Sequence, residues 1–181
     1  MNMRSKSIPA CTVLLLISMT QMAVAASLKQ DCNLPTGLQE QISSRYPGVH
    51  VVTLTDMDEY DRNLYLRDHD SQCPGLAAVD FYGDGKPTLA LVLLRDDAKG
   101  RRAELVVARK LQNGWEISSL DTAEAAPVPV VWGEKPGKYD DVQGQKTITA
   151  TKPVIVLCGY ESWAILYAWT GKRVEKIWIS D

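Results

Sequence analysis

Short apolar runs rich in β-branched residues, separated by compact turns, dominate the chain from residue 75 onward. Glycine and asparagine, which tolerate positive φ, mark the reversals at Gly83-Asp84-Gly85 and Asn113-Gly114. Such runs predict antiparallel strands, because parallel strands need long crossover connections. Residues 89–94 are apolar without interruption, which predicts a central strand buried on both faces.

Two blocks of four predicted strands follow this rhythm, at residues 76–121 and 146–181. Each block predicts one four-stranded antiparallel meander, a blade-like unit of about 40 residues. Residues 122–145 between them contain prolines and glycines and predict a linker or long loop, with one candidate strand at 128–132. Two blades do not close a propeller, so we expect two packed sheets or one strongly bent sheet.

Residues 35–46 predict a short amphipathic helix ahead of the strands. Leu38, Ile42 and Tyr46 recur at i, i+4 and i+8, and Pro47-Gly48 ends the pattern. Residues 56–72 are polar and predict no more than a helical turn. The prediction is therefore an α+β fold, mostly antiparallel β, in which the N-terminal helix covers an open sheet face.

The first 25 residues have the pattern of a cleaved secretory signal. Arg4 and Lys6 precede an apolar run at residues 8–17, and Ala23-Val24-Ala25 has the A-x-A form of a cleavage site. We expect a periplasmic or secreted protein with no stable membrane anchor, because Cys11, the cysteine nearest to a lipoprotein position, lies inside the apolar run. The remaining residues 26–181 fit a single β-rich domain.

Charge and motifs argue against several function classes. Removing the signal lowers Lys plus Arg from 20 to 18 against 22 Asp plus Glu, a formal net charge of −4 that predicts no nucleic-acid partner. The nucleophile motif G-x-S-x-G is absent, and the best-placed serine, Ser162, lies in a predicted turn away from His50 and His69. We therefore predict a non-catalytic protein, with an unrecognised hydrolase as an alternative.

Three cysteines remain after the signal is removed. In an oxidising compartment an odd number predicts one internal bridge and one free thiol. Cys32 and Cys73 lie in polar, turn-rich segments, whereas Cys158 ends an apolar run typical of a buried strand. We therefore predict a Cys32–Cys73 disulfide. A zinc site is disfavoured, since the chain has no C-x-x-C spacing and only two histidines.

Aromatic residues recur with period two in the predicted strand 163–170. Trp163, Tyr167 and Trp169 fall on one face together with Ile165. One interpretation is an exposed aromatic platform for a protein or glycan partner. The other, which we favour, is that this face belongs to the core.

The run Asp80-Phe81-Tyr82-Gly83-Asp84-Gly85-Lys86-Pro87 resembles the calcium-binding turn of FG-GAP/VCBS-type repeats in secreted β-propellers. In that family alternate oxygen ligands hold calcium and glycines permit the sharp turn. Asp80 and Asp84 match the first and third ligands, whereas Tyr82 and Thr88 stand where further Asp or Asn ligands are usual. The resemblance implies calcium at Asp80 and Asp84. The two departures favour a hairpin turn without metal, and hence no cofactor.

Residues 73–181 also resemble a group of small secreted bacterial proteins with the same D-F-Y-G-D-G-K-P and G-Y-x-S-W-A-x-L-Y-A-W runs. That resemblance implies export but no activity. We therefore predict a binding protein with an envelope protein partner, of the inhibitor or immunity type directed at a cell-wall-degrading enzyme. Lys138, Tyr139 and Asp140 in the segment 133–145 are candidate contacts of an inserting loop. The first alternative is a calcium-dependent FG-GAP-like adhesion or scaffold module.

Overall fold

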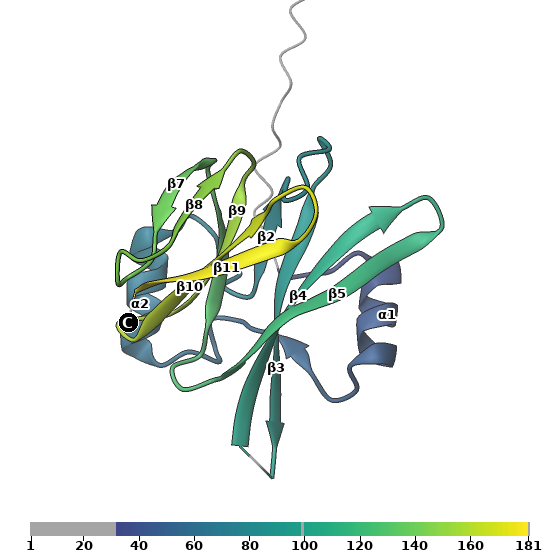
Figure 1. The fold of residues 1–181 in the computed structure, drawn as a ribbon. Coiled ribbons are helices and arrows are strands. Elements are labelled where there is room, and N and C mark those ends of the chain that lie inside the picture. The colour runs from purple at the N-terminus through teal and green to yellow at the C-terminus, as the bar shows by residue number, and fades with distance from the viewer. Residues whose placement is uncertain (1–31, 99, 181) are drawn as a thin grey trace, which may run out of the picture.

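The computed structural model describes residues 32–98 and 100–180, which form two antiparallel sheets, a β-hairpin and two helices (Figure 1). The predicted signal peptide lies outside these described residues. The elements, in chain order, are α1 (Thr36–Arg45), β1 (His50–Val51), α2 (Glu59–Asp68), β2 (Leu76–Val79), β3 (Thr88–Asp97), β4 (Gly100–Leu111), β5 (Gly114–Glu124), β6 (Val130–Glu134), β7 (Gly137–Asp140), β8 (Thr147–Ala150), β9 (Val154–Gly159), β10 (Trp163–Trp169) and β11 (Val174–Ser180). The prediction of a β-rich fold with antiparallel sheets is confirmed.

The first sheet, sheet A, has the order β1-β3-β4-β5, and β2 also pairs with β3. β3 and β4 pair in regular register, with Leu91 opposite Val106. β4 and β5 pair with Val107 opposite Ser118, and their register shifts between Leu105 and Val106. β3 is the central strand that residues 89–94 predict. Its alternate side chains, Val92 and Leu93 among them, enter cores on opposite faces of the sheet.

The second sheet, sheet B, has the order β11-β10-β9-β6. The prediction that residues 146–181 form a four-stranded meander is wrong, and the blade-like description is not confirmed. β6 takes the fourth place, with Val131 opposite Leu157 of β9, because its apolar Val130 and Val131 bury completely in the core between the sheets. The residues predicted to fill that place are 146–151, of which 147–150 pair elsewhere.

Those residues form β8, which pairs with β7 as a separate two-stranded hairpin. Residues 122–145 are therefore not a linker or a long loop, since they contain the end of β5, all of β6 and all of β7. The hairpin covers the outer face of sheet B, where Ile148 and Ala150 pack against Val156 and Leu166.

The main core lies between the two sheets. Val92 of β3, Ile155 of β9 and Tyr167 of β10 belong to it, and each is at most 1% exposed. The helix α2 adds Tyr65 to the same core, although the sequence predicts only a helical turn there. Asp58 caps α2 by accepting a hydrogen bond from the Asp61 backbone N–H at 2.8 Å, which satisfies one of the free donors of the first turn.

α1 covers the outer face of sheet A, on the opposite side from sheet B (Figure 1). Leu38 and Ile42 pack there against Leu91 and Val106, which confirms the predicted helix and the face that it buries. The Cys32–Cys73 disulfide is present and ties the segment before α1 to the residues before β2, while Cys158 is free and half-buried.

Candidate functional site

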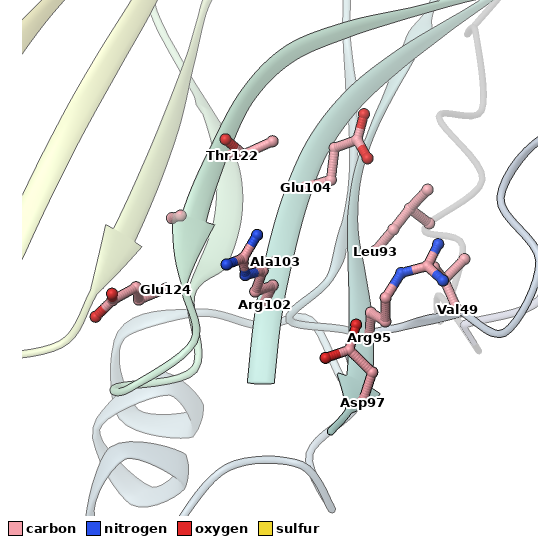
Figure 2. Close-up of a pocket in the computed structure, with 10 residues that line it drawn as sticks. Val49, Leu93, Arg95, Asp97, Arg102, Ala103, Glu104, Thr122 and Glu124 are labelled. Atoms are coloured by element: carbon pink, nitrogen blue, oxygen red, sulfur yellow. The ribbon is translucent and has the colours of Figure 1, made fainter. Parts of the chain in front are cut away.

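A hollow lined mainly by charged residues lies at one end of the outer face of sheet A, beyond the end of α1. It has a volume of about 580 Å³. Figure 2 shows its side chains, which come from the last residues of β3, the first residues of β4 and the last residues of β5, with Val49 at the rim. We call this hollow the charged pocket. Its charged residues are Arg95, Asp97, Arg102, Glu104 and Glu124.

Strand register explains why these side chains share one face. Arg95 lies opposite Arg102 on β3 and β4, and Arg102 lies opposite Glu124 on β4 and β5. Residues that face each other across antiparallel strands point to the same side of the sheet. The pocket is therefore the polar continuation of the surface that carries Leu91 and Leu93 under α1.

The two arginines stand directly opposite each other, an arrangement that destabilises a sheet. Their guanidinium groups point apart in Figure 2. Within residues 32–98 and 100–180, neither Arg95 nor Arg102 forms an ion pair or a side-chain hydrogen bond. Both cations are therefore available to an outside ligand.

Glu104 supplies negative charge at the inner wall of the pocket. Burial raises the pKa of the nearby Tyr46 hydroxyl, and the Glu104 carboxylate raises it further, against the opposing effect of Arg45. The pocket thus presents both signs of charge at positions set by a rigid sheet, which suits a partner with a complementary charge pattern.

A second hollow lies where the two sheets separate, between the end of β5 and the strands β10 and β11. Its volume is about 420 Å³, and we call it the wedge. At its base the Asp121 carboxylate accepts hydrogen bonds of 2.7 Å from the Tyr167 hydroxyl and from the Lys176 ammonium group. Burial alone raises the pKa of Asp121, but these two donors and the Thr122 N–H outweigh it and hold the pKa below its usual value.

The aromatic stripe of β10 is mostly core. Tyr167 is 1% exposed and Ile165 is buried, so Tyr167 is a core residue and not a partner contact. Trp169 is half-buried against Tyr82, with 5.2 Å between the ring centroids. Trp163, at the other end, is half-buried and lines the wedge, where it meets Trp178 of β11.

The candidate loop residues belong to a strand and not to a loop. Lys138, Tyr139 and Asp140 lie in β7, where Tyr139 is half-buried and its hydroxyl donates a hydrogen bond to the Lys135 carbonyl. Lys138 and Asp140 are exposed on the hairpin, and Asp140 accepts a hydrogen bond from the Thr147 hydroxyl. Residues 133–145 are therefore not a free loop, because they contain the end of β6 and all of β7, which pairs with β8 on sheet B. A contact between these residues and a partner stays a prediction.

The turn that resembles a calcium site is closed by protein groups. The two Asp80 carboxylate oxygens accept hydrogen bonds from the backbone N–H groups of Asp84 and Gly85 at 3.1 and 3.2 Å. Asp84 forms an ion pair with Arg109, which holds the pKa of Asp84 below its usual value. Among the residues that the structure describes, no three His, Cys, Asp or Glu side chains cluster closely enough to hold a metal ion.

The residues considered for hydrolysis are separated. His50 pairs with Asp56 at 2.9 Å, whereas His69 stacks between Tyr65 and Trp132. Asp56 also accepts hydrogen bonds from Thr53, so its carboxylate organises the turn after β1. In the described ranges no serine, threonine or cysteine side chain hydrogen-bonds to a histidine.

Sequence reasoning missed both the charged pocket and the wedge. Each of these two hollows is lined by residues of three strands, and no local sequence motif contains the residues of either one. Only the charged residues at the end of β3 and at the start of β4 offer a signal, and they are equally typical of a solvated strand end. No helix in residues 32–98 or 100–180 is long and apolar enough to cross a membrane. Comparisons with family models, with curated proteins and with solved structures found no match for this chain.

Proposed function

We propose that this chain is a non-catalytic binding protein that works in the periplasm or outside the cell and uses the charged pocket to dock on a protein partner. The observation that carries the proposal is the opposed pair Arg95 and Arg102, neither of which forms an ion pair among the described residues, although Glu124 lies opposite Arg102 on β5. A carboxylate of the partner would relieve the repulsion between the two cations. The Cys32–Cys73 disulfide is compatible with export, because such bonds persist in oxidising compartments.

The partner that we propose is a cell-wall-degrading glycosidase. Enzymes of this class carry two carboxyl groups on either side of the bond that they cleave, roughly 5 to 10 Å apart. Two arginines on neighbouring strands, with their guanidinium groups directed apart, complement such a pair. Glu104 and Glu124 would then meet basic groups at the rim of the enzyme cleft.

An inhibition assay tests this function directly. Purified protein is titrated into a set of cell-wall glycosidases, and the release of soluble fragments from purified cell wall is measured. We expect saturable inhibition of at least one enzyme. The double variant R95A/R102A should weaken inhibition by about tenfold or more, because it removes both charges from the contact.

The matched control is R173A. Arg173 is an exposed arginine at the turn before β11, far from the pocket in sequence and on the other sheet. Its replacement should leave inhibition unchanged. The proposed function is rejected if no glycosidase is inhibited, or if R95A/R102A inhibits as strongly as the unaltered protein and R173A.

A further inference from the structure

We infer that the wedge between the sheets is a binding site for a neutral saccharide. The wedge shares Thr122, Ala123 and Glu124 with the charged pocket, but neither Arg95 nor Arg102 lines it. The wedge is lined on the sheet B side by Trp163, Lys176 and Trp178, and on the sheet A side by Asp121 and Ala123. Ser162 lies at its mouth, in the turn between β9 and β10. No single segment contains the site.

Exposure of Trp178 is the first observation. Ile165 lies opposite Trp178 across β10 and β11, so Trp178 is directed to the inner face of sheet B, the face that elsewhere forms the core. Its side chain is nevertheless 45% exposed, because the sheets diverge at this edge. An aromatic ring on an inner face and open to solvent is a surface for stacking.

The geometry of the two indoles is the second observation. The rings of Trp163 and Trp178 meet at 66°, with their centroids 6.2 Å apart. They therefore form a corner and not a parallel stack. A pyranose ring has apolar C–H faces and polar edges, so one face can lie on an indole while an edge meets the second ring.

Polar groups around this corner match the hydroxyl groups of a sugar. The indole N–H groups of Trp163 and Trp178 have no hydrogen-bond acceptor among the described residues. Lys176 uses one of its three donors on Asp121 and is half-exposed, so further donors face the wedge. The Ser162 hydroxyl is exposed and both donates and accepts.

Charge selects a neutral ligand. Lys176 is the one cation among the described residues that line the wedge, and it is paired with Asp121 at 2.7 Å. Glu124 also lines the hollow. No net positive charge is left to hold a phosphate or a carboxylate. The volume of about 420 Å³ lies in the range of small-ligand pockets and accommodates one or two sugar rings.

The test is a titration with neutral trisaccharides, tri-N-acetylchitotriose and cellotriose, followed by NMR of the tryptophan indole N–H signals. The chain has five tryptophans, so each signal can be assigned by substitution. We expect saturable shifts of the Trp163 and Trp178 signals with a Kd of about 1 mM or tighter. The signals of Trp115 and Trp132, which lie outside the wedge, should not move.

W178A should weaken binding by about tenfold or more, whereas W178F, which keeps an aromatic ring, should weaken it less. L111A is the control, since Leu111 is 46% exposed at the far end of sheet A. Thermal melts of each variant establish that the fold is kept.

The inference is overturned if neither trisaccharide shifts the two signals, if W178A binds like L111A, or if adenosine, an aromatic probe, binds more tightly than both sugars. R95A/R102A should bind the sugars normally, so this test and the inhibition assay fail independently.

Discussion

Each sheet has a covered outer face, but the two covers are attached in different ways. α1 packs on sheet A through its side chains. The segment before α1 is joined to the rest of the fold by the Cys32–Cys73 disulfide. Arg45 adds one hydrogen bond of 2.6 Å from its side chain to the Ile117 carbonyl. Among the described residues no disulfide joins the β7–β8 hairpin to the rest of the fold, and short connections link it to β6 on one side and to β9 on the other.

This difference shows what each cover needs. A helix at the start of a domain is held by sequence connection at one end only, so a second attachment has to be supplied. A hairpin inserted between two strands of the same sheet is held at both ends by the chain. Removal of the disulfide beside α1 should therefore lower the free energy of unfolding more than truncation of a side chain that packs the β7–β8 hairpin on sheet B.

Removal of the disulfide should have the largest effect. The double variant C32A/C73A should lose about 4 kcal/mol of unfolding free energy, because the bond closes a loop with a sequence separation of 41 residues. Urea unfolding followed by circular dichroism measures the loss. C158A, which removes a free half-buried thiol, is the control and should change the free energy far less. If C32A/C73A loses as little unfolding free energy as C158A, α1 does not need the disulfide.

Truncation of one core residue under each cover sharpens the comparison. L38A should lose about 3 kcal/mol, since Leu38 is fully buried between α1 and sheet A. I148A should lose less, about 2 kcal/mol, because a two-stranded hairpin can open locally while the sheets stay folded. Hydrogen exchange should then report lost protection in β7 and β8 alone for I148A. Loss of protection across both sheets in I148A would contradict the local opening.

The contribution of Asp121, which joins the two sheets through Tyr167 and Lys176, to the free energy of unfolding should depend on pH. The pKa of Asp121 is lowered in the fold, so its stabilising effect is present above the unfolded value of 3.8 and disappears as the pH falls through the lowered pKa. D121N should therefore lose about 1–3 kcal/mol near neutral pH, and the difference from the unaltered protein should shrink in acid. Urea unfolding at neutral pH and at the acid limit of folding measures both values. A difference that is independent of pH would exclude the ionised carboxylate as its source.

Calcium should have the smallest effect. Both carboxylates of the 80–87 turn are engaged by protein groups, so millimolar calcium should leave the melting temperature unchanged. A thermal melt with calcium, compared with one in a chelator, measures this. D84N provides the control for any change caused by ionic strength. A rise of several degrees in the unaltered protein and none in D84N would support the FG-GAP-like alternative.

Local patterns in the sequence predict much of the fold. The i, i+4, i+8 repeat at Leu38, Ile42 and Tyr46 predicts α1, and the uninterrupted apolar run in β3 predicts its central position. The polar setting of Cys32 and Cys73 predicts the disulfide. In each case the signal lies within a short segment, so no knowledge of distant residues is needed.

The errors concern choices between distant segments. Both 128–132 and 146–151 have strand character, and the sequence does not rank them as partners of β9. The structure favours β6, whose Val130 and Val131 bury fully between the sheets, whereas β8 has exposed Thr147 and Thr149 alternating with Ile148 and Ala150 and suits a one-sided hairpin. The full length of the helix α2 was missed because its apolar residues do not form one buried face: Tyr65 is buried, whereas Tyr60 and Leu66 are exposed.

By itself, the sequence determined most of the strands and turns, the first helix and the disulfide, because each depends on side chains close together in the chain or on the chemistry of a few cysteines. Only the tertiary structure decided which strands became neighbours, which end of the aromatic stripe stayed open and which charges met across the sheets. Arg95 meets Arg102, and Trp163 meets Trp178, only after strand register and sheet packing are set. These pairings depend on the free energy of burying whole faces, to which many distant residues contribute together.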